Sequence, residues 1–202
     1  MEQQATLAQI GWRIILMKIK SFNLFRKKSQ FQDDFPIAQF SDLPKRRSFY
    51  PMFLSLEKHK IYAHSARFMI KPEDQSIIEN LIELHFHKKI NINEKKKKVA
   101  DHDKILIFYK FSEFGQDIVR VITNDNEFVK CLCEAGFEPP GPEIVFPDKN
   151  FGNYGSLQGE MAFWWDVYWE PFWKCLREDE RKDYLGRSNF SVDTIQFLEC
   201  RQ

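Results

Sequence analysis

Apolar and polar positions along the chain alternate in some segments and recur at the helical period in others. Two segments read most clearly as strands, Lys104–Phe111 and Gln116–Thr123, because both are rich in β-branched and aromatic residues. The four residues between them are too few for a parallel crossover, so we expect an antiparallel hairpin. The near-continuous apolar run in Lys104–Phe111 also favours an interior place in the sheet, covered on both faces.

Further strands are expected before this hairpin. Residues 12–24 alternate loosely between apolar and polar positions, which predicts a strand. Phe49–Leu56 and Lys60–Phe68 are rich in aromatic and β-favouring residues, so these two segments are candidates for pairing as strands. Between them and the first strand, Arg26–Arg47 holds scattered apolar residues, two prolines and three aspartates. This composition predicts a long connection with little regular structure.

Helices are predicted on either side of the hairpin. Between Lys71 and His87 the apolar residues recur at the helical period, and a proline and acidic residues occupy the first turn. A second helix is expected to begin at Asn124 or Asp125, either of which can cap an N-terminus. Gly136 is a typical residue to end that helix.

The C-terminal part of the chain is expected to be mainly helical. Ile144–Phe146 is predicted to be a short strand, but Glu160–Trp169 and Phe172–Leu185 read as helices, with Pro171 forcing a kink or a new start between them. Ser191–Cys200 is expected to be a final helix capped by Ser191. Strands, a helix, strands and then helices predict an α+β fold around a small, mainly antiparallel sheet.

Length and composition agree with one ordinary domain. The chain has 202 residues, of which 43% are hydrophobic and 29% charged, and this excludes disorder over the whole chain. Residues 17–202 are expected to form a single α+β domain, with residues 1–16 as a possible N-terminal extension because Met17 would make a natural chain start. No apolar run reaches the roughly 18 residues of a membrane helix. With no secretion signal in view, we expect a cytoplasmic location and reduced cysteines.

The formal charge is divided unevenly along the chain. Residues 1–100 carry +9 and residues 101–202 carry −8, although the whole chain carries only +1. One interpretation is that the two halves fold together and their charges mix over one surface. The other is that the C-terminal half contributes an acidic contact face.

Candidate catalytic and metal chemistry is sparse. No P-loop, nucleophile elbow, zinc-protease motif or dinucleotide fingerprint occurs in the chain. His85 and His87, with Asp101–Asp103 downstream, resemble metal ligands, but a helix would turn the two histidines about 200° apart. We therefore expect neither a metal nor a cofactor. The run Lys95–Lys98 contains no aromatic residue for base stacking, so we interpret it as a solvated loop and nucleic acid as an unlikely partner.

The most distinctive segment is the aromatic run Phe163–Trp173. It holds four of the five tryptophans of the chain, together with acidic residues on the same stretch. A stripe of rings at helical spacing is usually core, but one stripe cannot bury rings that surround a helix. We therefore predict that some of these side chains form an acidic, tryptophan-rich surface that binds a protein partner. The predicted site comprises Glu160, Trp164, Asp166, Tyr168 and Glu170.

This combination resembles the immunity proteins of bacterial polymorphic toxin systems. The resemblance rests on the segment from Gly159-Glu160 through Trp164-Trp165 and Trp169-Glu170-Pro171 to Trp173 in a small α+β chain with an acidic half. It implies that the protein binds and neutralises a cognate toxin, often a nuclease. Two alternatives stay open. One is an enzyme of another family using Glu160, Asp166 or His102, and the other is a nucleic-acid-binding accessory protein using Lys95–Lys98 and Arg26–Lys28.

Overall fold

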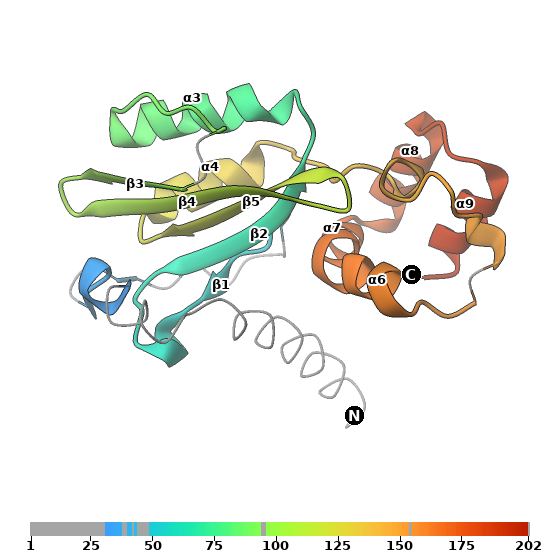
Figure 1. Cartoon of the computed structure of the whole chain (residues 1–202), viewed down its shortest axis with the longest axis horizontal. Coiled ribbons are helices and arrows are strands. Elements are labelled where there is room, and N and C mark those ends of the chain that lie inside the picture. Colours follow the sequence, from blue (N-terminus) through green and yellow to red (C-terminus); the bar gives the residue numbers. More distant parts are fainter. Residues whose placement is uncertain are drawn as a thin grey trace.

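An antiparallel sheet of five strands organises the part of the chain that the computed structural model describes, namely residues 31–37, 40, 41, 43, 49–93, 96–153 and 155–201. The strands are β1 (Leu54–Ser55), β2 (His64–Ile70), β3 (Lys96–Asp101), β4 (Lys104–Glu113) and β5 (Gln116–Thr123). Their spatial order is β1-β2-β5-β4-β3 (Figure 1). The predicted strand at residues 12–24 and the predicted extension at residues 1–16 lie outside the described residues.

The predicted hairpin is confirmed. β4 and β5 pair antiparallel up to the couple Glu113 and Gln116, and the turn consists of Phe114 and Gly115 alone. Both turn residues have positive φ, 53° and 69°, which a two-residue hairpin turn with the twist of the strands requires. β4 lies between β5 and β3, so its predicted interior position is also correct. The predicted pairing before the hairpin is confirmed as β1 against β2, where Leu54 lies opposite Ser65.

Two helices cover one face of the sheet. They are α3 (Asp74–Phe86) and α4 (Asn126–Glu134), which lie on the same side of the strands in Figure 1. Phe86 of α3 and Phe128 of α4 meet edge to face with ring centroids 5.3 Å apart above the strands. The N-terminus of α4 is capped as predicted, because the Asp125 carboxylate accepts hydrogen bonds from the backbone N–H groups of Glu127 and Phe128. We call this side the α3 face of the sheet.

The C-terminal helices pack together beside the sheet (Figure 1). They are α5 (Pro142–Val145), α6 (Gly159–Trp164), the π-helical turn η4 (Trp165–Trp169), α7 (Glu170–Cys175), α8 (Glu178–Arg187) and α9 (Val192–Glu199). Two short 3-10 turns are η2 (Glu57–His59) and η3 (Phe151–Asn153). Ser191 caps α9 as predicted, since its hydroxyl accepts the Thr194 N–H. Residues 142–201 are called the helical unit below.

Three local predictions are wrong. Ile144–Phe146 is not a strand, because Pro142 starts the short helix α5. Phe172–Leu185 is not one helix, since Leu176 and Arg177 are extended and separate α7 from α8. The lysine run is not a loop, since Lys96–Lys98 belong to β3. Within Arg26–Arg47, the described residues hold one helical turn at residues 31–34, which agrees with the expected little regular structure.

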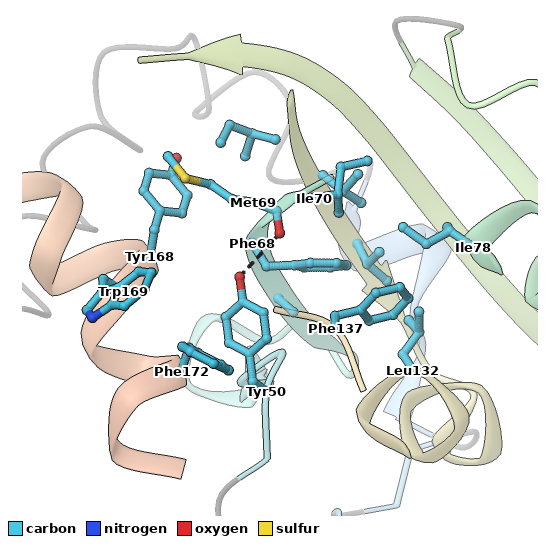
Figure 2. Packing of buried hydrophobic residues seen from close by; sticks show 14 of the residues in the cluster. Tyr50, Phe68, Met69, Ile70, Ile78, Leu132, Phe137, Tyr168, Trp169 and Phe172 are labelled. Atoms are coloured by element: carbon cyan, nitrogen blue, oxygen red, sulfur yellow. Dashed lines mark hydrogen bonds between the residues drawn. The ribbon is translucent and has the colours of Figure 1, made fainter. Parts of the chain in front are cut away.

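The buried side chains form two clusters. The larger one fills the space between the α3 face, the helices above it and the helical unit; Figure 2 shows part of it around Phe68 and Tyr50. The smaller cluster lies on the opposite face of the sheet, where Phe31 and Phe35 cover Ile107 and Ile122. Among the described residues, no helix combines the length and the apolar content needed to cross a membrane.

Candidate functional site

The aromatic run is part of the hydrophobic core. Trp164 and Tyr168 are both 0% exposed, so the prediction that they stand on a binding surface is wrong. The rings are covered because the continuous stretch α6–η4–α7 is surrounded by its own chain on several sides. Trp164 packs against Phe146 after α5 with ring centroids 5.4 Å apart, and Trp169 packs against Tyr184 of α8 at 6.1 Å.

Tyr168 also anchors the helical unit to the sheet. Its hydroxyl donates a hydrogen bond to the Glu113 carboxylate at 2.7 Å, and the Arg67 guanidinium lies 5.2 Å from its ring centroid. Arg67 is ion-paired with the same Glu113 carboxylate. Burial raises the pKa of the Tyr168 phenol well above its ordinary value, so the group stays protonated and remains a donor. This arrangement joins η4 to β2 and β4.

The three acidic members of the predicted site remain accessible, but they do not converge with the aromatic ones. Glu160 is exposed at the start of α6. Asp166 and Glu170 follow one another at helical spacing, and Glu170 is paired with Lys174 at 2.8 Å. Burial and the neighbouring Glu170 raise the pKa of Asp166. These carboxylates therefore lie outside the core that encloses Trp164 and Tyr168.

The charge division of the sequence is partly cancelled by folding. Acidic residues of the second half pair with basic residues of the first, as Glu113 does with Arg67 and Glu138 does with Lys71. The helical unit keeps an acidic excess, because residues 142–201 carry eleven acidic and seven basic side chains. Both interpretations of the charge pattern therefore hold in part. Basic and acidic residues of the two halves pair at the sheet, and the helical unit carries a net charge of −4.

A groove of about 270 Å³ lies between the segment before β1, the segment after α4 and the helical unit. It is lined by Phe49, Tyr50, Gly136, Phe137, Glu138, Phe172, Cys175, Leu176 and Glu180, most of which are apolar. We call this the junction groove. Phe49 is 42% exposed, whereas Tyr50, Phe137 and Phe172 form a floor that is at most 6% exposed.

The floor of the junction groove is held by specific contacts. The Tyr50 hydroxyl donates to the Met69 carbonyl oxygen at 3.3 Å, and its ring meets Phe172 edge to face at 5.5 Å (Figure 2). Phe137 follows the left-handed Gly136, at φ +73°, and packs on Phe68 with centroids 5.7 Å apart. The groove is therefore built on residues that the sheet and α7 hold in place.

Both carboxylates at the groove are already neutralised. Glu138 is bound by both terminal nitrogens of Arg187 and by the Lys71 ammonium. Although burial alone would raise it, these contacts hold the pKa of Glu138 below its ordinary value. Glu180 accepts the backbone N–H of Arg177 at 2.6 Å. Neither carboxylate is thus placed as a free acid or base.

The thiols beside the junction groove are half-buried hydrogen-bond donors. Burial raises the pKa of Cys133 to about 11, so this thiol is protonated at neutral pH and its S–H faces the Pro51 carbonyl at 3.4 Å. Cys175 donates to the Pro171 carbonyl at 2.9 Å. The chemistry of the groove suits an apolar side chain, since its walls are rings and aliphatic carbon.

The histidines weighed as metal ligands have separate partners. His85 Nδ1 lies 3.5 Å from the Asp125 carboxylate, and His87 Nδ1 lies 2.9 Å from Asp101. Their side chains therefore have different partners, and His87 lies just beyond the end of α3 with a left-handed φ of 50°, so the helical period does not set the angle between them. Within the described ranges, no three histidine, cysteine, aspartate or glutamate side chains gather as a metal site would require.

Sequence reasoning missed the junction groove because its walls come from three segments that are far apart in the sequence. Phe49 and Tyr50 belong to a segment predicted only as a strand, and Phe172 and Leu176 to a predicted helix. The only local signal is Gly136, whose positive φ turns Phe137 into the groove floor. Comparisons with protein-family models, curated proteins and solved structures found no match to this chain.

Proposed function

We propose that this chain is a cytoplasmic protein-binding module that neutralises a cognate toxin, as an immunity-type inhibitor. The observation that carries the proposal is the junction groove, an apolar recess with Phe49 exposed at its rim and with both carboxylates paired. Apolar recesses bordered by aromatic residues are typical places for the anchor residues of protein interfaces. The partner side chain that suits it is aliphatic or aromatic.

The charge of the helical unit supports a basic partner. Its excess of acidic residues includes Glu160, Asp166 and Glu170, which stay outside the core. A toxin that acts on nucleic acid carries a basic cleft, and an acidic body is attracted to such a surface before contact is made. In this proposal the acidic residues set the rate of association, and the groove holds the partner once it has docked.

The groove is tested by exchanging its rim residue. Phe49→Asp places a charge at the mouth of the groove, and Leu84→Asp is the matched control, because Leu84 is exposed on the outer side of α3. Both variants and the parent chain are used to capture partners from the native cell, and each captured protein is expressed alone to find one that arrests growth. Circular dichroism melts verify that all three proteins are folded.

The expected result is a growth-arresting protein that the parent and Leu84→Asp bind alike. A carboxylate at the mouth of the groove would lie against the apolar anchor of the partner, and disrupting such a contact costs about 2–4 kcal/mol, so Phe49→Asp should bind that protein at least about 30-fold more weakly. Co-expression of the parent chain should restore growth, whereas Phe49→Asp should not. Equal binding by Phe49→Asp would exclude the groove, and a captured partner that is harmless when expressed alone would exclude neutralisation.

The role of the acidic residues in association is measured separately. Asp166→Lys and Glu160→Lys should lower the association rate with the captured toxin, most strongly at low ionic strength, and leave the dissociation rate nearly unchanged. An association rate that is the same for the parent and both variants at low salt would show that the acidic excess has no part in binding.

A further inference from the structure

A row of three basic side chains and one tyrosine crosses the sheet on the face opposite to α3 and α4. Lys96 of β3, Tyr109 of β4, Arg120 of β5 and Arg67 of β2 are directly paired across the four strands. Cross-strand partners point to the same face of a sheet. We call these four residues the cationic row.

Arg120 lies at the centre of this row. Its neighbours Val119 and Val121 are buried in the larger cluster on the α3 face, so Arg120 points to the other face. Along β5 the row is flanked by Ile118, which belongs to the larger cluster, and by Ile122, which belongs to the smaller one. The cationic row therefore marks the boundary at which the two apolar clusters meet on this face.

The other basic side chains of the row have partners. Arg67 is ion-paired with Glu113, and the Lys96 ammonium lies over the rings of Phe31 and Tyr109 at 5.6 and 5.2 Å. Arg120 makes neither a hydrogen bond nor an ion pair with any described residue. Asp34, an acidic residue on the same side of the sheet, is ion-paired with Lys98.

Arg120 and Arg67 lie directly opposite one another, and like charges in that position repel. Nη2 of Arg67 is ion-paired with Glu113, whereas Nε is buried without a hydrogen-bond acceptor among the described residues. Burial lowers the pKa of the Arg120 guanidinium, and Arg67 lowers it further. Arg120 is half-buried, and a partly desolvated guanidinium whose donors have no protein acceptor is stabilised when an acceptor binds it.

We propose that Arg120, with Arg67 beside it and Lys96 two strands away in the same row, binds an oxyanion, either a phosphate or a carboxylate carried by a small ligand. A guanidinium offers parallel N–H donors that match both groups in bidentate fashion. The flanking Tyr109 and Phe111 rings provide an apolar border. This site is separate from the junction groove and does not depend on the proposed toxin partner.

The test is a thermal-shift and calorimetric titration of the full chain. Phosphate, pyrophosphate, acetate and citrate are compared with chloride at equal ionic strength, so that general salt effects cancel. Arg120→Met removes the charge and keeps the apolar length, while Arg120→Lys keeps the charge and loses the bidentate donors. Lys130→Met on the exposed side of α4 is the matched control for loss of one positive charge.

The expected result is a saturable rise in the melting temperature of the parent chain, about 5–10 °C at an anion concentration about 100 times Kd. The rise should persist in Lys130→Met, shrink in Arg120→Lys and vanish in Arg120→Met. A response to phosphate and pyrophosphate alone identifies a phosphate site, and a response to acetate and citrate identifies a carboxylate site.

Two results would overturn the proposal. One is a parent chain whose melting temperature changes with every oxyanion as it does with chloride. This result can be interpreted without any variant. The other is an oxyanion response that is equal in the parent and Arg120→Lys or Arg120→Met. Should Arg120→Met not fold, calorimetry on the parent and Arg120→Lys decides the matter, because equal affinities of the two would rule out bidentate binding.

Discussion

Truncating Trp164 should destabilise the protein rather than disturb a surface. The indole is fully buried and packs against Phe146 and Trp169, with ring centroids 5.4 Å away in both cases. Trp164→Ala would leave a cavity where these rings meet, and buried tryptophan-to-alanine changes cost about 3–5 kcal/mol. For a chain of this size each kcal/mol lowers the melting temperature by about 2–4 °C, so the fall should be about 6–20 °C.

The assays are thermal and urea unfolding followed by circular dichroism, a signal that does not depend on the removed fluorophore. Glu160→Ala, one turn earlier and exposed, is the control and should stay within about 0.5 kcal/mol of the parent. Trp164→Phe should cost less than the alanine change, because the Trp164 Nε1–H is buried without an acceptor among the described residues. If Trp164→Ala were as stable as the Glu160→Ala control, the core placement of this ring would be refuted.

Three further perturbations test individual contacts. Tyr168→Phe removes the hydrogen bond to Glu113 and should cost about 1–3 kcal/mol in urea unfolding; no loss would mean that this bond does not hold η4 to the sheet. Asp125→Ala removes the α4 cap and should cost about 1–2 kcal/mol, whereas Asp125→Asn should retain most of the stability. An equal loss of stability in the two variants would contradict the capping role. Because Arg187 helps to hold the pKa of Glu138 below its ordinary 4.5, the stability from this carboxylate is present above about pH 4.5 and lost as the pH falls through the lower folded value. Glu138→Gln should therefore be less stable than the parent at pH 7 and approach it in acid, and a constant difference from pH 3 to 7 would contradict this.

Local chemistry explains the parts of the fold that could be predicted. The β4–β5 hairpin is set by two apolar strands around a short turn, and the starts of α4 and α9 are set by Asp125 and Ser191, which act within their own first turns. These signals lie within a few residues of the structure that they specify. The α+β class follows from the order of such elements along the chain.

The features that could not be predicted depend on contacts between distant segments. Trp164 reads as a surface candidate until Phe146 and the other helices enclose it. Leu176 continues a helical pattern but is extended, and it lines the junction groove with Phe49 from far earlier in the chain. No spacing within one segment encodes such an arrangement, so the groove and the burial of the predicted aromatic site required the folded chain.

The lysine run in β3 has a consequence for how copies of this protein meet one another. β3 and β1 are the outer strands among those described, and outer strands expose backbone groups that can pair with a strand of another molecule. β1 offers only two residues, too few for a stable ladder. β3 offers six residues, but Lys96, Lys97 and Lys98 follow one another along it. Two β3 edges brought together would therefore repel each other. The charge run thus discourages edge-to-edge aggregation of a sheet whose interior strands are strongly apolar.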